Sequence, residues 1–530
     1  METAQLIKAL SRPGAYPHHP DAVEIVQTHI SVVALAGELV YKVRKPVDMG
    51  FLDFTTLEKR CADCHAEVEL NRRLAPSVYL GVVPIAESGD GLLVEGSDEP
   101  IEWAVKMRRL PEDATLESRL AHDEISAAQI ETLAERIAAF HRGAERGPHI
   151  SEVACFETIS RNLLENLHHP GAKEPEGTDA EILARLTTLT TQALEAARPL
   201  IEERSRCDVP CDCHGDLKTD HVYLFPDAAP PDDLVIIDCI EFNERFRYID
   251  PVADMAFLAM DLTYQGRRDL SRALIARYFR SGGDEQGRAL LQLYLSYRAA
   301  VRAKVLSIQA GEAETDAAAR EALLEKARTY RLLSLGEIEA PGKRAGLVLI
   351  GGLPGTGKST LAHAAAEAFG FELIRSDLVR KELAGLAPET PGTDALYSAE
   401  MSERTYKGCA RRAGKILARG GRVIVDANFR EEARRIPFVQ LARECAARML
   451  FAECRTPEQA IRRRLEKRGP DASDADWAVY RKLRDEWEPP AAQTARVAHS
   501  IDTGDSPEAA LRALAGLLRA EGLLPEEQGP

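Results

Sequence analysis

The chain has 530 residues, 45% of them hydrophobic, and a formal net charge of −16 at pH 7. Because one hydrophobic core rarely serves more than about 300 residues, the length predicts more than one domain. The acidic balance disfavours a broad nucleic-acid-binding surface, although a local basic groove stays open as an alternative. The N-terminus lacks a signal-peptide pattern, and no apolar run reaches the roughly 18 residues of a membrane span, so we expect a cytoplasmic protein without a membrane partner.

The first part of the chain, residues 1–335, begins with strand patterns and ends with long helical patterns. A helix is expected over 55–74. Strands are expected at 28–36, 39–44, 80–86, 91–95 and 101–107. Strands followed by helices predict an α+β domain.

The ten cysteines are expected to be free thiols, because a cytoplasmic protein keeps its cysteines reduced. Two clusters leave a metal site open as an alternative, Cys61-x2-Cys64-His65 and Cys207-x3-Cys211-x-Cys213. The first cluster lies within a predicted helix, and no second CxxC completes a zinc quartet. Ordinary thiols are therefore the preferred interpretation.

A linker is expected over residues 336–345, where Pro341 and Gly342 interrupt the helical pattern. The second domain, residues 346–525, then alternates strands and helices. The expected strands are 347–350, 371–374, 422–426 and 448–453, and the expected helices include 358–369 and 395–419. This alternation predicts an α/β domain with a doubly wound parallel sheet.

Two acids of the first domain stand where phosphoryl transfer to a hydroxyl needs them. Asp216 lies in CHGDLKTDHVYL, and Asp238 ends an apolar strand. A carboxylate at the first position can orient or deprotonate an acceptor hydroxyl, and one at the second can hold Mg²⁺ against the ATP phosphates. Taken singly, each acid is equally consistent with a turn cap or a strand end.

Taken together, these motifs resemble the aminoglycoside phosphotransferase family, whose fold is protein-kinase-like, over about residues 20–330. The resemblance implies that Asp216 is the catalytic base and Asp238 the principal metal ligand. The family pattern HGDxxxxN also implies a second metal ligand at position 221, where this chain has His221. Because imidazole prefers softer metals than Mg²⁺, either the metal site is altered or the first domain is weakened.

The same resemblance implies an ion pair beside the ATP phosphates. The segment YKVRKP is similar to the family strand that carries the phosphate-binding lysine, and HAEVELNRRL to the helix that carries its glutamate. We expect these residues to be Lys42 and Glu67. Lys45 and Glu69 stay open as alternatives, because strand register decides which side chains point inward.

The most specific motif is the segment from Leu347 to Gly370, which fits GxxxxGK[ST] between an apolar strand and a helix. Backbone N–H groups of such a loop surround phosphate oxygens, Lys358 reaches the outer phosphates, and Ser359 can hold Mg²⁺. The expected nucleotide is ATP, with GTP as the alternative. The expected nucleotide-binding residues of this loop are Gly352, Gly355, Thr356, Gly357, Lys358, Ser359 and Thr360.

Two further acids follow strands of the second domain. Asp377 is expected to accept the proton of a substrate hydroxyl, with Arg380 binding the substrate, although Asp377 is also a good helix N-cap. Asp426 ends the strand VIVD and is suited to the Mg²⁺ shell.

An arginine-rich helix beyond residue 460 is interpreted as a lid over the phosphate site. Arg464 and Arg468 are four residues apart on one helix face, so both are expected to reach the transferring phosphate when the lid closes. A solvated basic face is the alternative. Residues 346–522 resemble P-loop kinases related to zeta toxins, gluconate kinase and the polynucleotide 5′-kinase domain, which implies that Thr503 and Gly504 line the adenine.

The order of the two halves resembles proteins described as bifunctional aminoglycoside phosphotransferase-like and ATP-binding proteins. The resemblance implies an ATP- and Mg²⁺-dependent kinase that phosphorylates hydroxyl groups of small molecules. Two alternatives stay open. One is a polynucleotide 5′-hydroxyl kinase, suggested by Asp377 and Arg380; the other is a nucleotide-gated regulatory protein with a non-catalytic first domain, suggested by His221.

Overall fold

The computed structural model describes residues 3–48, 52–88, 91–168, 176–282, 284–312, 315–387, 390, 394–466 and 477–526. The chain divides into two units, which we call the first and the second unit. The first unit comprises Met1–Asn162 and Ala196–Tyr294, and the second comprises Leu163–Glu195 and Leu295–Pro530.

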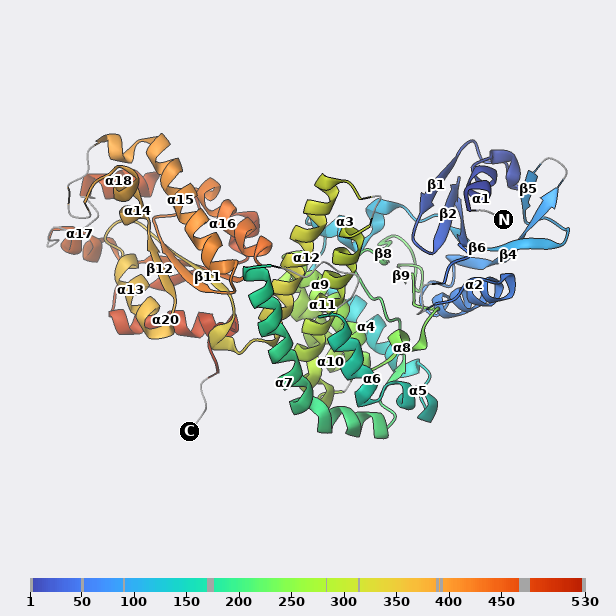
Figure 1. Cartoon of the computed structure of the whole chain (residues 1–530). Coiled ribbons are helices and arrows are strands. Elements are labelled where there is room, and N and C mark those ends of the chain that lie inside the picture. The colour runs from blue at the N-terminus through green and yellow to red at the C-terminus, as the bar shows by residue number, and fades with distance from the viewer. Residues whose placement is uncertain are drawn as a thin grey trace. The chain divides into compact units, whose positions relative to one another are not determined.

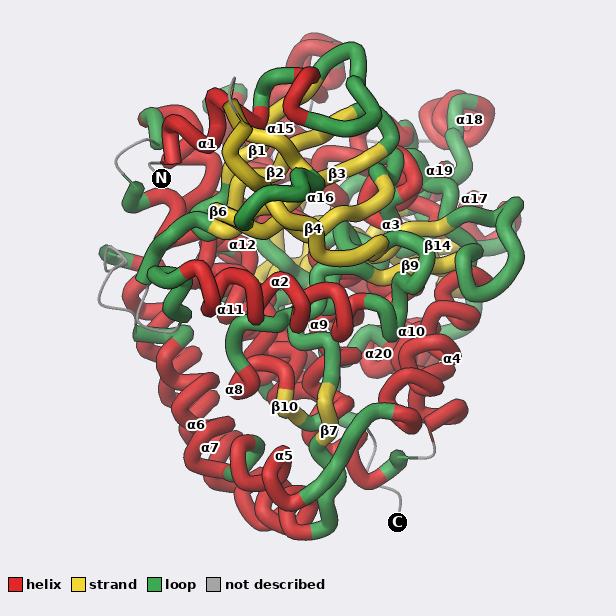
Figure 2. The backbone as a smooth tube through the Cα atoms, turned by 90° about the vertical axis from the view of Figure 1, so that its right-hand side faces the viewer, coloured by secondary structure: helices red, strands yellow, loops and turns green. Residues whose placement is uncertain are grey.

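The first unit opens with an antiparallel six-stranded sheet in the order β1-β2-β3-β6-β4-β5. Helix α2 (Leu57–Asn71) runs along this sheet (Figures 1 and 2), and the Thr56 side chain caps its first turn. The sequence patterns missed β1, because most of its residues are exposed and its apolar signal is weak. The strands are β1 (Val23–Gln27), β2 (Ser31–Ala36), β3 (Leu39–Arg44), β4 (Tyr79–Ser88), β5 (Gly91–Val94) and β6 (Pro100–Arg108).

The remainder of the first unit is mainly helical. Helix α9 (Pro251–Tyr264) is almost entirely buried, and α10 (Arg268–Gly282) packs against both α9 and α4 (Ala127–Gly143). Two short ribbons pair β7 with β10 and β8 with β9. Their bounds are β7 (Cys211–Asp212), β8 (Val222–Leu224), β9 (Leu234–Ile236) and β10 (Tyr248–Ile249). The shorter helices are α1 (Thr3–Leu10), α3 (Leu116–Ala121), α5 (Pro148–Val153) and α8 (Glu244–Arg247).

Three helices contain residues of both units: α6 (Phe156–Glu165), α7 (Thr178–Arg206) and α11 (Leu291–Ala310). The second unit adds α12 (Ala317–Ile338) and a parallel five-stranded sheet in the order β12-β13-β11-β14-β15. Its strands are β11 (Gly346–Gly351), β12 (Glu372–Arg375), β13 (Arg422–Asp426), β14 (Arg448–Arg455) and β15 (Ala498–Asp502). Its later helices are α13 (Lys358–Phe369), α14 (Ser376–Leu383), α15 (Ala399–Leu417), α16 (Glu432–Glu444), α17 (Glu458–Glu466), α18 (Trp477–Asp485), α19 (Ala492–Ala495) and α20 (Pro507–Ala520).

Hydrophobic side chains cover both faces of the parallel sheet, because alternate strand residues point to opposite faces. On one face, Val348 and Ile350 pack with α13 and α20. On the other face, Leu347 and Leu349 pack with α15 and α16. The core of this second face also contains Ile182 and Leu186 of α7 and Leu332 and Leu335 of α12. The second unit is therefore larger than the P-loop sheet and the helices that follow it in sequence.

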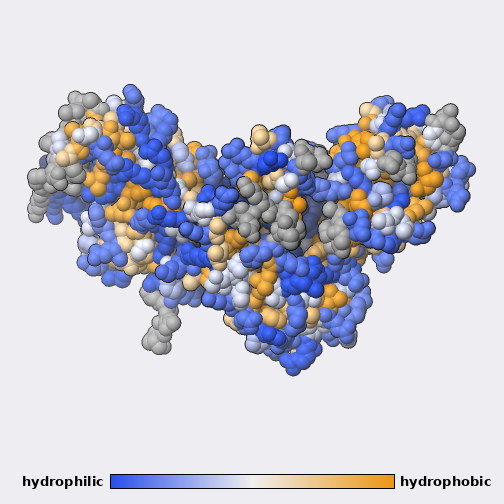
Figure 3. Space-filling view, viewed as in Figure 1, coloured by the Kyte–Doolittle hydropathy of each residue, from blue (hydrophilic) through white to orange (hydrophobic). Residues whose placement is uncertain are grey.

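The predicted order of fold classes is confirmed: an α+β part with an antiparallel sheet precedes an α/β part with a parallel sheet. The hydropathy view shows hydrophilic residues mixed with small apolar patches on the visible face (Figure 3). Within the described ranges, no helix combines the length and apolar character needed to cross a bilayer.

Candidate active sites

The strand register of β3 points the Lys42 side chain toward Glu67 of α2, and the two residues form an ion pair. Lys42 Nζ lies 2.8 Å from Glu67 Oε1 and 3.2 Å from Asp238 Oδ1. Lys45 instead donates to the carbonyl of Thr28, and Glu69 is exposed. Burial opposes the charge of Lys42, but Glu67 and Asp238 outweigh it and hold the Lys42 pKa above its ordinary value. The structure thus brings together the lysine and glutamate that the sequence favoured.

A second cation, Arg44, was not predicted and is fully buried beside this pair. Its Nε donates to Asp63 at 2.5 Å and its Nη1 to Ser31 at 2.9 Å. Its Nη2 donates to Glu67 Oε2 at 2.6 Å and also to Glu241. One guanidinium therefore fixes the glutamate that holds Lys42.

The loop that carries Asp216 turns sharply at Gly215. Gly215 has φ +86°, and a Cβ there would lie 2.8 Å from the carbonyl of Phe246, so a side chain would clash. Asp254 of α9 accepts the N–H of both His214 and Gly215 at 2.9 Å. His214 Nε2 donates to Ile237 O at 3.0 Å, and burial lowers the His214 pKa to about 4. The loop is held by one acid and one neutral imidazole.

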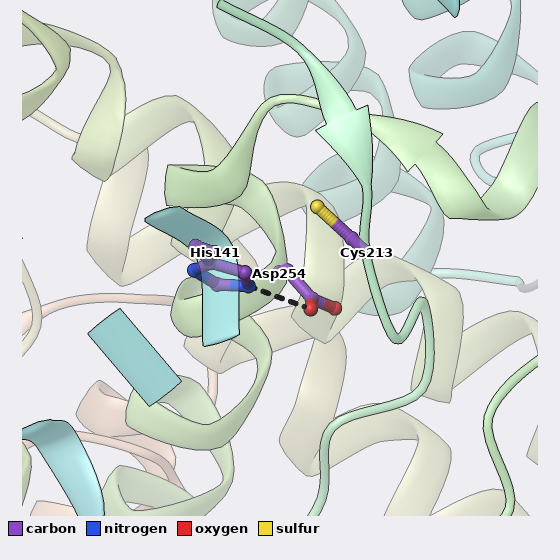
Figure 4. Close-up of side chains that lie close together, drawn as sticks. All are labelled: His141, Cys213 and Asp254. Carbon is purple, nitrogen blue, oxygen red and sulfur yellow. Dashed lines mark hydrogen bonds and ion pairs between the residues drawn. The ribbon is translucent and has the colours of Figure 1, made fainter. Parts of the chain in front are cut away.

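Figure 4 shows Asp254 with its neighbours His141 and Cys213. His141 Nε2 lies 3.1 Å from Asp254 Oδ2, and the other ring nitrogen lies 2.8 Å from the Tyr278 hydroxyl. Because Asp254 and His141 already form hydrogen bonds with other protein groups, we interpret this buried group as a support for the loop and not as a metal centre. The Cys61–Cys64–His65 cluster does not assemble a ligand group among the described residues.

Asp216, His221 and Asp238 lie close together at the end of this loop. Each offers one ligand atom, and these atoms lie within 4.8 Å of one another. Lys42, acting against burial and helped by Lys218, holds the Asp238 pKa below its usual range. Two carboxylates and an imidazole are a donor set that fits a divalent cation. The predicted metal residues His221 and Asp238 are therefore neighbours in space.

Lys218 was not singled out in the sequence. Its Nζ lies 3.2 Å from Asp216 Oδ2 and 3.5 Å from Asp220 Oδ2. A lysine two residues after the acid of the HGD motif is the signal that could have found it. It places a positive charge beside the expected catalytic carboxylate, where a phosphoryl group would also carry negative charge.

The P-loop of the second unit connects β11 to α13. Gly352 has φ +142°, and a Cβ there would lie 2.8 Å from the carbonyl of Cys454. The Thr356 carbonyl accepts from the hydroxyls of Thr503 at 2.5 Å and Thr456 at 3.1 Å. The loop is thus tied to the carboxyl ends of β14 and β15, and Lys358 and Ser359 begin α13 at its N-terminus.

Asp426 ends β13 beside the P-loop. It is buried, and among the described residues its Oδ1 has no hydrogen-bond partner. Burial raises the Asp426 pKa, although Lys358 and Ser359 oppose this effect. A buried carboxylate oxygen next to a lysine and a serine fits the coordination shell of a divalent cation.

Asp377 and Arg380 lie together on α14. Arg380 Nη1 lies 3.5 Å from Asp377 Oδ1, and its guanidinium lies over the Tyr397 ring, 5.0 Å from the centroid. Arg375 pairs with Asp426 in the parallel register of β12 and β13, and Asp377 follows Arg375 by two residues, so the two acids lie at the same edge of the sheet. Asp377 and Arg380, which are expected to bind the acceptor, therefore lie at the same sheet edge as Asp426, which is expected to hold the cation.

Helix α17 packs on the P-loop. A Cβ at Gly355 would lie 2.9 Å from Ile461 Cγ2. Arg464 Nη2 donates to the Thr503 carbonyl at 2.8 Å, and Nη1 lies 3.4 Å from the Gly355 carbonyl. Arg464 therefore lies at the P-loop, whereas Arg468 lies outside the described residues.

Two family models match the chain. The model described as "Phosphotransferase enzyme family" matches residues 52–294, and the model described as "AAA domain" matches residues 347–490. The first range contains the loop with Asp216, and the second contains the P-loop.

The chain is also similar to curated proteins along most of its length. "Uncharacterized protein Rv2004c" of Mycobacterium tuberculosis (strain ATCC 25618 / H37Rv) is 31% identical over 457 residues, which covers 86% of this chain and 88% of the relative. "Uncharacterized protein Mb2027c" of Mycobacterium bovis (strain ATCC BAA-935 / AF2122/97) has the same identity and coverage.

Solved structures match the chain over part of its length. The amicoumacin kinase hAmiN is 14% identical, with a TM-score of 0.38, and the match covers 62% of this chain and 93% of that chain. A gluconokinase from Sinorhizobium meliloti 1021 is 20% identical, with a TM-score of 0.26, and the match covers 34% of this chain and 94% of that chain. These are likenesses of fold, and no acceptor follows from them.

Proposed function

The chain belongs to a family that joins a phosphotransferase domain to a P-loop domain of the AAA type, and on that premise we propose that each unit transfers phosphate from ATP to an alcohol. The proposed acceptors are hydroxyl groups of small molecules. ATP is the proposed donor, with GTP as the alternative, and Mg²⁺ is the expected cation of the second unit.

The observation that carries the proposal is the position of Lys42 between two acids. Its Nζ contacts Glu67 on one side and Asp238 on the other. A lysine held in this way is oriented toward the place where phosphate oxygens would approach a cation-binding acid. The P-loop of the second unit supports the same chemistry through a different fold.

In the first unit, Asp216 would orient the acceptor hydroxyl and accept its proton. The acceptor oxygen forms a bond to the γ-phosphorus of ATP, and the bond from that phosphorus to the bridging oxygen of ADP breaks. Lys42 and Lys218 would offset negative charge on the phosphates. Asp238 and His221 would hold a divalent cation, which supplies further charge neutralisation when bound.

In the second unit, P-loop N–H groups and Lys358 would hold the phosphates, and Asp377 would take the acceptor proton. Arg380 would bind the acceptor. Ser359 and Asp426 would hold the cation. Arg464 already lies at the P-loop backbone, so a small movement of α17 would bring its guanidinium toward a bound phosphate.

The test is a screen of metabolites and nucleosides for acceptor-dependent ATP consumption with the full chain. Asp216→Asn is expected to abolish transfer to acceptors of the first unit only, and Asp377→Asn transfer to acceptors of the second unit only. Asp21→Asn and Glu367→Gln are controls, because both acids are exposed: Asp21 precedes β1, and Glu367 lies in the last turn of α13, at the end away from Lys358. Transfer that survives both active-site substitutions would show that these acids are not the catalytic bases.

A further inference from the structure

We propose that His221 Nε2 is itself a ligand of the cation in the first unit, so that this site prefers borderline divalent cations such as Mn²⁺ and Co²⁺ to Mg²⁺. The inference rests on the proposed function of that unit, because the cation is the one that would accompany ATP. It deepens that function by naming the metal class.

The hydrogen bond at the other ring nitrogen fixes the tautomer of His221. Nδ1 lies 2.9 Å from the main-chain carbonyl oxygen of Asp216. A carbonyl oxygen can only accept, so Nδ1 carries the proton and donates it. In the neutral imidazole, the lone pair is therefore on Nε2. A histidine that ligates a metal usually donates its other N–H to a carbonyl or carboxylate in this way.

The Nε2 lone pair faces carboxylate oxygens. It lies 3.5 Å from Asp238 Oδ2 and 3.9 Å from Asp220 Oδ1. Asp220 Oδ1 is buried and has no hydrogen-bond partner among the described residues. Two atoms that each ligate one ion at about 2.1 Å are roughly 3 to 4 Å apart, so the separation of Nε2 from Asp238 Oδ2 fits a shared cation.

The main chain holds the ring in place. The His221 N–H donates to the Lys218 carbonyl at 3.2 Å, and the His221 carbonyl accepts the N–H of Ile237 at 3.0 Å. Ile237 directly precedes Asp238, so His221 is attached to the strand end that presents this acid. The His221 side chain is only 12% exposed. The ring is thus positioned before any cation arrives, which is typical of a binding site.

The charge around the imidazole also favours a cation. Carboxylate oxygens of Asp216, Asp220 and Asp238 lie within 4 Å of its ring nitrogens. Lys42 pairs with Asp238, and Lys218 with Asp216 and Asp220. Nitrogen ligands bind Mn²⁺ and Co²⁺ better than Mg²⁺, which prefers oxygen. The family asparagine would offer an oxygen at this position, so the change to histidine alters the metal class.

Pulsed EPR of Mn²⁺ bound to the full chain tests this ligand directly, because an imidazole nitrogen bonded to Mn²⁺ modulates the spin echo. The probe is Mn²⁺ with inorganic tripolyphosphate, which contains no nitrogen. The predicted cation residues of the second unit, Ser359 and Asp426, offer only oxygen. Nitrogen modulation is expected in wild type and in His149→Asn, an exposed control histidine. It is expected to be lost in His221→Asn and in His221→Gln.

Competition of Mg²⁺ against bound Mn²⁺ gives a second reading. His221→Asn is expected to lower the preference for Mn²⁺ by about tenfold or more. Bound Mn²⁺ without nitrogen modulation in wild type would overturn the inference. Modulation that persists in both His221 variants would also overturn it, because the nitrogen would then come from another residue. Nitrogen modulation without any phosphoryl transfer would support His221 as a metal ligand but contradict the proposed function. Phosphoryl transfer without nitrogen modulation would support the proposed function but contradict the role of His221.

Discussion

Arg44 Nη2 lies 2.6 Å from Glu67 Oε2, on the carboxylate whose other oxygen accepts from Lys42. Lys42, the proposed phosphate-binding lysine of the first unit, is therefore positioned by a second cation two residues further along the same strand. Arg44 is buried, so its loss would leave several carboxylates without their cation. The guanidinium of Arg44 therefore both stabilises the first unit and positions Lys42 through Glu67.

Arg44→Ala is expected to destabilise the first unit by about 3 to 5 kcal/mol, because it leaves buried carboxylates unpaired. The matched control is Arg109→Ala, which removes the exposed pair with Glu24 and is expected to cost less than about 1 kcal/mol. Hydrogen exchange of the β3 and α2 amides reports this unit separately from the second. Equal protection in the two variants would contradict a stabilising role for the Arg44 cluster.

The cluster also predicts a dependence of stability on pH. Burial raises the Glu241 pKa to about 8, although Arg44 opposes this effect. Between the ordinary value of 4.5 and about 8, the unfolded chain is ionised at this group while the folded chain holds a proton. Unfolding then releases a proton, so the Glu241 contribution to stability falls as pH rises through this range. Below it, the contribution is fully present.

Glu241→Gln is expected to remove this part of the pH dependence, since glutamine does not ionise. The measurement is amide exchange of β3 and α2 at several values between about pH 5 and pH 8, where one unit of pKa shift corresponds to about 1.4 kcal/mol. Glu38→Gln is the control, because Glu38 is exposed at the turn between β2 and β3. The same slope in wild type and in Glu241→Gln would refute the raised pKa.

Asp426→Asn distinguishes the effect of this buried acid on folding stability from its proposed role in binding the cation. Burial raises the pKa of this carboxyl, so its charge destabilises the folded second unit at neutral pH, and the neutral amide is expected to leave the melting temperature unchanged or higher. The stabilisation by Mg²⁺ with a non-hydrolysable ATP analogue is expected to be lost, because it depends on binding to the folded state. Thermal melts with and without that ligand measure both effects, with Glu367→Gln, an exposed position in the last turn of α13, as the control.

The outcome would count against a cation role for Asp426 if the variant kept the full ligand-induced shift. Lys358→Ala provides a reference for the loss of phosphate binding, since this lysine belongs to the P-loop. A variant that loses the shift without losing stability shows that the acid is kept for binding and not for folding.

The P-loop could be predicted from sequence because its strand, loop and helix are contiguous. Lys358, Ser359 and the glycines lie within a few residues of one another, and local backbone conformation alone brings them together. The loop with Asp216 and the acid Asp238 were proposed from a resemblance to family motifs, because each acid taken singly is equally consistent with a turn cap or a strand end. The choice of Lys42 over Lys45 needed the register of β3, which depends on pairing with β2 and β6.

The Arg44 cluster could not be predicted, because its members come from distant segments. Ser31, Asp63, Glu67 and Glu241 are separated by up to 210 positions, and no local pattern links them. The packing of α7 and α12 on the P-loop sheet is similar: it depends on apolar side chains that meet only in the folded chain.

Asp254→Asn tests whether the acid beneath the Asp216 loop acts by positioning. Its Oδ1 accepts from Gly215, and its Oδ2 accepts from both His214 and His141. An asparagine turns one of these oxygens into an amino group that faces a donor, so at least one loop N–H loses its acceptor. Exchange at the amides of His214 and Gly215 is therefore expected to rise.

With an acceptor found in the screen, first-unit turnover in Asp254→Asn is expected to fall by about 100-fold, because a displaced loop misplaces the Asp216 carboxylate. The KM for ATP is expected to change less, since Lys42 lies on a different element. Cys213→Ala is the control: this thiol is buried in the same group, and its Sγ lies 3.5 Å from both Cys211 Sγ and the Ile249 carbonyl oxygen. If Cys213→Ala raised the His214 and Gly215 exchange as much as Asp254→Asn does, packing and not the carboxylate would hold the loop.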